Sequence, residues 1–181
     1  DISAPLREWP QLLARDEQIA YESATIGHEG WGNERGTMLT LTRAKVLLVE
    51  DDPREQNMVL SVAEQLKPAP EVDLVHNGKE ALVYLDELTH DRLPQLVLLD
   101  LDLPMVHGLE VLRRIRKRYL TRGVPVTVFT GSLSAEDLAV AERYNASFVR
   151  KPILNDEYMD TLHKILHYWT VLNCTVTLPR D

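Results

Sequence analysis

Five short runs of aliphatic residues recur between Lys45 and Arg150, and they constrain the fold more than any other feature of the sequence. The runs are KVLLVE, EVDLVH, QLVLLD, VPVTVFT and ASFVR. Short, nearly continuous apolar runs are typical of strands that are buried on both faces of a parallel sheet. Segments with helical spacing follow the runs and can supply the crossovers that parallel strands need. The sequence therefore predicts a doubly wound α/β domain, in which a five-stranded parallel sheet carries helices on both faces.

The helical segments have apolar positions that can face this sheet. The fourth helix is predicted to begin at Ser134, whose hydroxyl can cap it together with Asp137, and the fifth runs from about Asn155 to Leu172. The apolar positions expected in the first three helices are Val59, Val62 and Leu66, then Ala81, Leu85 and Leu88, then Leu112, Ile115 and Tyr119.

The first 42 residues differ from this pattern. Pro10 is well placed to begin a short helix that ends near Tyr21, and the glycine-rich stretch GHEGWGNERG that follows is typical of a loop or linker. We therefore expect three parts: a partly helical extension and linker over 1–42, the α/β domain over 43–173, and a tail over 174–181.

Composition and charge limit the partners and the compartment. The net charge of −8 and the pI near 5.3 argue against binding nucleic acid or anionic lipid over the whole surface. The basic run RRIRKRYLTR is interpreted as the solvated face of a helix. No apolar run approaches the roughly 20 residues that span a bilayer, so no membrane segment is expected. A single cysteine, Cys174, excludes an internal disulfide and suits a cytoplasmic protein.

Polar side chains follow the ends of the predicted strands. Because ligands of an open parallel sheet bind beyond the carboxyl ends of its strands, these side chains are expected to converge. Oxygen-rich clusters of carboxylates suit Mg²⁺, and a nearby lysine and hydroxyl can receive a tetrahedral anion. The set therefore fits phosphoryl transfer to an aspartate. The residues concerned are Glu50, Asp51 and Asp52 after the first run, Asp100 and Asp102 after the third, Thr130 at the end of the fourth, and Lys151 after the fifth.

Together these positions resemble the receiver domain of two-component response regulators. The matching motifs are LLVEDDP, LVLLDLDLPMVHG, VFTGS and FVRKP, and the resemblance covers about residues 44–172. It implies a signalling domain, not an enzyme in its own right, that takes a phosphoryl group from a sensor histidine kinase.

The resemblance also implies a role for each matching residue. Asp100 would be the phosphoacceptor, and Thr130 and Lys151 would contact the phosphoryl oxygens. The implied switch residues are Thr130 and Phe148. The implied Mg²⁺ ligands are Asp51 and Asp100 directly, Glu50 through water, and the backbone carbonyl of Asp102.

The C-terminal stretch LHYWTVLNCTVTLP looks like that of small stand-alone regulators that partner bacterial and cyanobacterial phytochromes. The printed sequence ends at Asp181, so no DNA-binding output domain is expected at this end. Apolar residues in the fifth helix have coiled-coil spacing. We expect some of them, with the fourth helix, the fifth strand and the tail, to form a homodimer surface. The candidates are Tyr158, Leu162, Ile165, Trp169 and Leu172.

Two other classes of protein remain open at this level. Haloacid-dehalogenase-like phosphatases also carry two aspartates after an apolar strand, and the positions of Asp100, Asp102, Thr130 and Lys151 fit them. Their metal-binding acidic pair follows the lysine, whereas here the pair comes before it, in VEDDP. A degenerate receiver that acts only as an interaction module is the other alternative, although every phosphotransfer position is filled.

Overall fold

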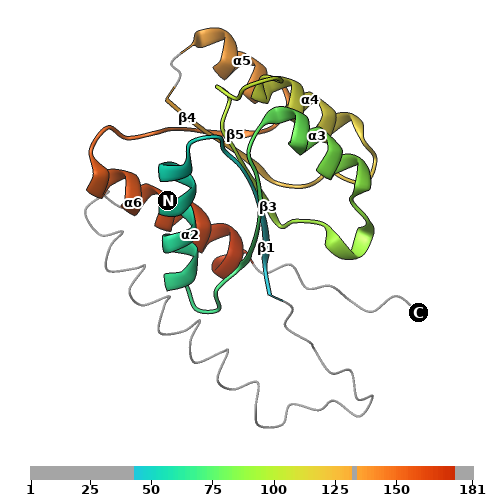
Figure 1. Cartoon of the computed structure of the whole chain (residues 1–181). Helices are drawn as coiled ribbons and strands as arrows, with labels where there is room; N and C mark the ends of the chain where they lie inside the picture. The colour runs from blue at the N-terminus through green and yellow to red at the C-terminus, as the bar shows by residue number, and fades with distance from the viewer. Residues whose placement is uncertain (1–42, 132–133, 174–181) are drawn as a thin grey trace, which may run out of the picture. The chain divides into compact units, whose positions relative to one another are not determined.

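The computed structural model of the chain describes residues 43–131 and 134–173, and these form a five-stranded parallel sheet (Figure 1). The strand order is β2-β1-β3-β4-β5, with neighbours in parallel register. The strands are β1 (Lys45–Val49), β2 (Glu71–Val75), β3 (Leu96–Leu99), β4 (Val126–Thr130) and β5 (Ser147–Arg150). The doubly wound fold predicted from the apolar runs is confirmed.

Helices connect the strands, and several of them begin at a residue whose side chain caps the helix. Asp52 accepts a hydrogen bond from the Arg54 N–H at the start of α2, and Asn77 does the same for the Glu80 N–H in α3. Ser134 caps α5 as expected, since its Oγ accepts from the Asp137 N–H at 3.3 Å. The helical elements are α2 (Pro53–Gln65), α3 (Gly78–Glu87), η1 (His90–Arg92), α4 (Gly108–Lys117), α5 (Ala135–Arg143), α6 (Asn155–His167) and a π-helical turn, η2 (Tyr168–Leu172).

The sheet separates two apolar layers. One face carries α3, α4 and α5, and the other carries α2 and α6 (Figure 1). Successive residues of β1 serve opposite layers, because Leu47 and Val49 pack under α3 and α4 whereas Val46 and Leu48 pack under α2 and α6. This two-sided burial explains why the strands lack the alternation of a half-exposed sheet.

Burial corrects two sets of sequence predictions. Tyr119 was expected on the apolar face of the third helix, but α4 ends at Lys117 and Tyr119 is 77% exposed. The sequence also predicts Tyr158 and Leu162 at a dimer surface, but both are buried against the sheet within the chain. They cannot form a surface between copies, because the stripe on α6 first has to cover the sheet.

Two arginines of the basic run depart from its interpretation as a solvated face, whereas Arg114, Lys117 and Arg122 are exposed. Arg116 is half-buried and donates to the carbonyl oxygens of Tyr144, Val124, Asn145 and Arg122. Arg118 donates to carbonyl oxygens near the end of α3. These two guanidinium groups therefore join helices and loops of the α3–α5 layer.

The predicted extension over 1–42 and tail over 174–181 lie outside the described residues. Within residues 43–131 and 134–173, no helix has both the length and the apolar character needed to cross a bilayer.

Candidate functional site

The register of β1 and β3 brings together the acidic residues that follow these two strands. Val49 pairs with Leu99 in the parallel ladder of β1 and β3, so Glu50 and Asp100 leave the sheet side by side. The Asp100 N–H donates to the Val49 carbonyl at 3.0 Å. Both side chains are nearly enclosed, with 4% of Glu50 and 7% of Asp100 exposed. Two carboxylates are therefore held together at the carboxyl edge of the sheet.

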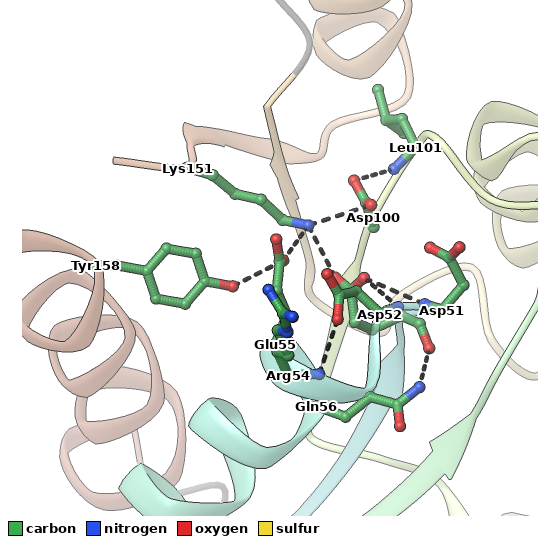
Figure 2. Close-up of polar contacts among 10 residues, drawn as sticks. Asp51, Asp52, Arg54, Glu55, Gln56, Asp100, Leu101, Lys151 and Tyr158 are labelled. Carbon is green, nitrogen blue, oxygen red and sulfur yellow. Dashed lines mark hydrogen bonds and ion pairs between the residues drawn. The ribbon is translucent and has the colours of Figure 1, made fainter. Parts of the chain in front are cut away.

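Lys151 reaches this edge from β5. Its N–H donates to the Thr130 carbonyl at 2.9 Å, which fixes the lysine beside the end of β4. Its Nζ lies 2.8 Å from Glu50 Oε2 and 3.1 Å from Asp100 Oδ2 (Figure 2). Burial alone would lower the pKa of Lys151, but the charges of Asp100 and Glu50 outweigh burial and raise it. The ammonium group therefore stays charged among the carboxylates.

An oxygen-rich cluster suited to a hard cation lies beside the lysine. One carboxylate oxygen from each of Glu50, Asp51 and Asp100 lies within 4.8 Å of the others. Burial raises the pKa of Glu50 to about 7, and Lys151 opposes that shift. This arrangement is costly for carboxylates alone and favourable once a cation is among them. The donor set therefore fits Mg²⁺, which prefers carboxylates, carbonyls and water.

Backbone hydrogen bonds fix the orientation of both buried carboxylates. The N–H groups of Asp51 and Asp52 each donate to Glu50 Oε1 at 3.1 Å. The Leu101 N–H donates to Asp100 Oδ1 at 2.7 Å, which leaves Oδ2 turned towards Lys151 (Figure 2). These bonds use one oxygen of each carboxylate and orient the other towards the lysine.

A glycine allows α4 to begin close to the backbone of Asp100. The Gly108 N–H donates to the Leu101 carbonyl at 2.9 Å, and a Cβ on Gly108 would lie 2.2 Å from the Asp100 carbonyl oxygen. His107 caps the helix, since its Nδ1 accepts from the Leu109 N–H at 3.3 Å. The motif PMVHG thus shapes the loop that follows Asp100.

The structure brings together Glu50, Asp51, Asp100 and Lys151, as the sequence predicted. Thr130 is fully buried at the end of β4, and Phe148 packs on the α3–α5 side of β5. The Asp102 side chain is exposed, and it is absent from the cluster of three carboxylates. The roles assigned to all seven of these residues stay predictions.

Sequence reasoning missed two residues at this site. Glu55 Oε2 lies 2.5 Å from Lys151 Nζ, and the Tyr158 hydroxyl donates to the same oxygen at 2.8 Å (Figure 2). The only signal for Glu55 is its place three residues after the capping Asp52, which is typical of a capping box. Tyr158 carries no local signal, because its contact with Glu55 joins two helices about a hundred residues apart.

Comparison with known proteins identifies what this chain resembles. The sequence profile described as "Response regulator receiver domain" matches residues 46–163. The probable methanogenesis regulatory protein FilR2 of Methanothrix harundinacea is 36% identical, over 68% of this chain and 82% of that protein. Response regulator Rcp1 of Synechocystis is 30% identical, over 74% of this chain and 92% of that protein.

Solved structures give the same result. A phosphorylated cyanobacterial phytochrome response regulator, RcpA, superposes with a TM-score of 0.69 and 25% identity, over 76% of this chain and all of that chain. A Mn²⁺-bound form of Rcp1 superposes with a TM-score of 0.67 and 27% identity, over 76% of this chain and 99% of that chain. The similarity covers the α/β domain and includes relatives associated with phytochromes.

Proposed function

The chain belongs to the response regulator receiver family, and on this premise we propose that Asp100 accepts a phosphoryl group from a sensor histidine kinase. The observation that carries the proposal is the position of Asp100 Oδ2, 3.1 Å from the Lys151 ammonium and within the acidic cluster. A nucleophilic carboxylate, a fixed cation and a site for a metal ion are the elements that phosphoryl transfer needs.

In the proposed step, Asp100 Oδ2 attacks the phosphorus of a phosphohistidine. The new O–P bond forms as the N–P bond breaks, and the imidazole leaves with the electron pair of that bond. The Leu101 N–H holds the other carboxylate oxygen, so the attacking oxygen has one orientation. Lys151 remains protonated and stabilises the negative charge of the phosphoryl oxygens, with Thr130 as a second contact.

The proposed Mg²⁺ would be held by Asp51, Asp100 and the backbone carbonyl of Asp102, with Glu50 acting through water. When bound, the ion would neutralise charge on the phosphoryl oxygens. The three clustered carboxylates support this assignment. Rcp1, a relative of this chain, has a Mn²⁺-bound structure.

Incubation with Mg²⁺ and acetyl phosphate tests the proposal. We expect an alkali-labile adduct of one phosphoryl group, detected by intact-protein mass spectrometry, and Asp100→Asn should abolish it. Asp102→Asn removes an exposed carboxylate but keeps the backbone carbonyl, so this variant should still form the adduct. Absence of an adduct in the unaltered protein would contradict the proposal and favour a degenerate receiver.

Because the chain belongs to the receiver family, we prefer this function to that of a haloacid-dehalogenase-like phosphatase. The acidic pair after β1 agrees with the receiver family. If Asp102→Asn also abolished the adduct, or if the protein steadily hydrolysed phosphate monoesters, a general-acid role for Asp102 would return.

We further propose that this chain acts in the cytoplasm and that its kinase is a bacteriophytochrome-type sensor, since RcpA is described as a phytochrome response regulator. A panel of purified histidine kinases tests this partnership by the initial rate of phosphoryl transfer. A phytochrome kinase should be the fastest, and faster transfer from an unrelated kinase would contradict the assignment.

The proposed output is a change of conformation and association, without binding to nucleic acid. Phosphorylation would draw Thr130 inwards, reorient Phe148 and alter the surface of α5, β5 and α6. The added charge at Asp100 would thus shift the equilibrium between two conformations of the domain. Of the dimer candidates, Ile165 and Trp169 are partly buried and Leu172 is 38% exposed. These three, with the tail, remain the proposed homodimer surface.

A further inference from the structure

A third carboxylate binds the active-site lysine from outside the expected set of site residues. Glu55 comes from the first turn of α2, and its Oε2 lies 2.5 Å from Lys151 Nζ. Tyr158, from α6, donates its hydroxyl to that same oxygen at 2.8 Å. Figure 2 shows Lys151 and Tyr158 converging on Glu55 from two sides. Neither Glu55 nor Tyr158 belongs to the acidic cluster.

The position of Glu55 is set by packing and not by helix capping. In a capping box its carboxylate would accept from the Asp52 N–H, but that N–H donates to Glu50. Tyr158 is 6% exposed, and its ring centroid lies 5.1 Å from that of Phe129, which fixes its hydroxyl. Glu55 is therefore held towards Lys151 by a buried residue of another helix.

Lys151 has as many carboxylate neighbours as its ammonium group has N–H donors. An ammonium group has three N–H donors, and Nζ lies near one oxygen each of Glu50, Glu55 and Asp100. A phosphoryl group on Asp100 replaces the Asp100 carboxylate beside the lysine and then shares the lysine with Glu50 and Glu55, which keep their charges. Glu50 also accepts two backbone N–H bonds, whereas Glu55 has Tyr158 in addition to the lysine.

We propose that Glu55, oriented by Tyr158, is a positioning residue that competes with the phosphoryl group for Lys151 and so weakens the phosphorylated state. This inference rests on the proposed phosphoryl acceptance at Asp100. Replacing the Glu55 carboxylate by an amide of the same size should leave Lys151 more available to phosphoryl oxygens. The reason is that an ammonium group binds a carboxylate more strongly than a neutral amide.

Binding of beryllofluoride, a phosphoryl mimic, at saturating Mg²⁺ measures this competition by fluorine NMR. We expect Glu55→Gln to tighten binding by roughly three- to tenfold, as the loss of one partly exposed charged partner predicts. Glu64→Gln is the matched control: it makes the same charge change on an exposed residue of α2, nine residues further along the helix. This control should leave binding unchanged.

Tyr158→Phe tests whether the tyrosine acts through Glu55, because it keeps the buried ring and removes only the hydroxyl. We expect a smaller tightening in the unaltered background and none in the Glu55→Gln background, since the two changes act on one contact. If the substitution instead disturbed the fold, it would change beryllofluoride binding by the same factor in both backgrounds and would lower the thermal unfolding midpoint.

The outcomes separate this inference from the function on which it rests. If the unaltered protein fails to bind beryllofluoride, both are contradicted. If it binds while Glu55→Gln matches Glu64→Gln or binds more weakly, only the role of Glu55 is overturned. Equal effects of Tyr158→Phe in both backgrounds would overturn the role of Tyr158.

Discussion

At the scale of single residues, Gly108 is where the backbone leaves no room for a side chain. A Cβ there would lie 2.2 Å from the Asp100 carbonyl oxygen and 2.7 Å from the Leu101 Cα. Gly108→Ala should therefore lower the free energy of unfolding by about 1–3 kcal/mol, as overpacking does elsewhere. It should also slow phosphorylation by acetyl phosphate, because the loop that carries Asp100 has to move.

Gly123→Ala is the control for this prediction, since nothing lies within 4 Å of a Cβ at that position. Urea denaturation and the rate of adduct formation are the two measurements. Equal stabilities for the two alanine variants would show that the loop after Asp100 accommodates the methyl group.

At the scale of elements, Arg116 joins the end of α4 to the loops around α5. It donates at 2.6 Å to the Tyr144 carbonyl and at 2.7 Å to the Val124 carbonyl. Burial lowers its pKa, and lysine cannot reproduce the planar fork of donors. Arg116→Lys should therefore reduce the free energy of unfolding by about 2–4 kcal/mol.

Arg113→Lys provides the comparison on the same helix. Its ion pair with Glu110 is exposed and spans 3.5 Å, so the substitution should change stability by less than about 0.5 kcal/mol. Chemical denaturation measures both variants. If Arg116→Lys were as stable as Arg113→Lys, the carbonyl contacts would contribute little to joining these elements.

The last helix separates residues that stabilise the fold from residues available to a partner. Leu162 is fully buried, so Leu162→Ala should cost about 2–5 kcal/mol of stability. Leu172 is 38% exposed at the end of η2, and Tyr168 is 51% exposed. Leu172→Ser should leave the thermal midpoint nearly unchanged and weaken the proposed homodimer.

Light scattering with and without beryllofluoride measures that association. Val83→Ser is a suitable control, because Val83 is an exposed apolar residue on α3, in the layer opposite α6. If Leu172→Ser and the unaltered protein have the same molar mass in both states, the end of η2 is not the dimer surface. Trp169→Ala is a less specific test, because Trp169 also packs against the core.

At the scale of the whole molecule, the acidic cluster links stability to pH and Mg²⁺. The pKa of Glu50 is about 7 in the folded protein and 4.5 in the unfolded chain. Protonated Glu50 therefore contributes most to the free energy of unfolding below pH 4.5, and this contribution is lost as the pH rises through about 7. Mg²⁺ binds the deprotonated cluster, so the increase in thermal midpoint on adding Mg²⁺ should be larger near pH 8 than near pH 6.

Thermal unfolding with and without Mg²⁺ at the two pH values measures this linkage. Glu50→Gln should remove most of the pH dependence, because an amide does not titrate in this range. An equal gain from Mg²⁺ at both pH values in the unaltered protein would contradict the assignment of the proton to Glu50.

The order of the residues was enough to predict the sheet and to group most residues of the candidate site. Continuous apolar runs require two-sided burial, and parallel strands deliver their carboxyl ends to one edge, so Glu50, Asp51, Asp100 and Lys151 could be grouped from order alone. Helix starts were equally local, since a capping side chain such as Ser134 bonds within its own turn.

Which long side chains meet between elements depends on tertiary packing and could not be predicted from local patterns. Glu55 matches a local capping pattern yet contacts Lys151, and Arg116 lies in a basic run yet is half-buried on carbonyl groups. The α6 stripe could not reveal that Tyr158 and Leu162 are core residues, because apolar spacing is the same for a sheet and for a second copy. Periodicity fixes which face of a helix is apolar, whereas packing fixes what covers it.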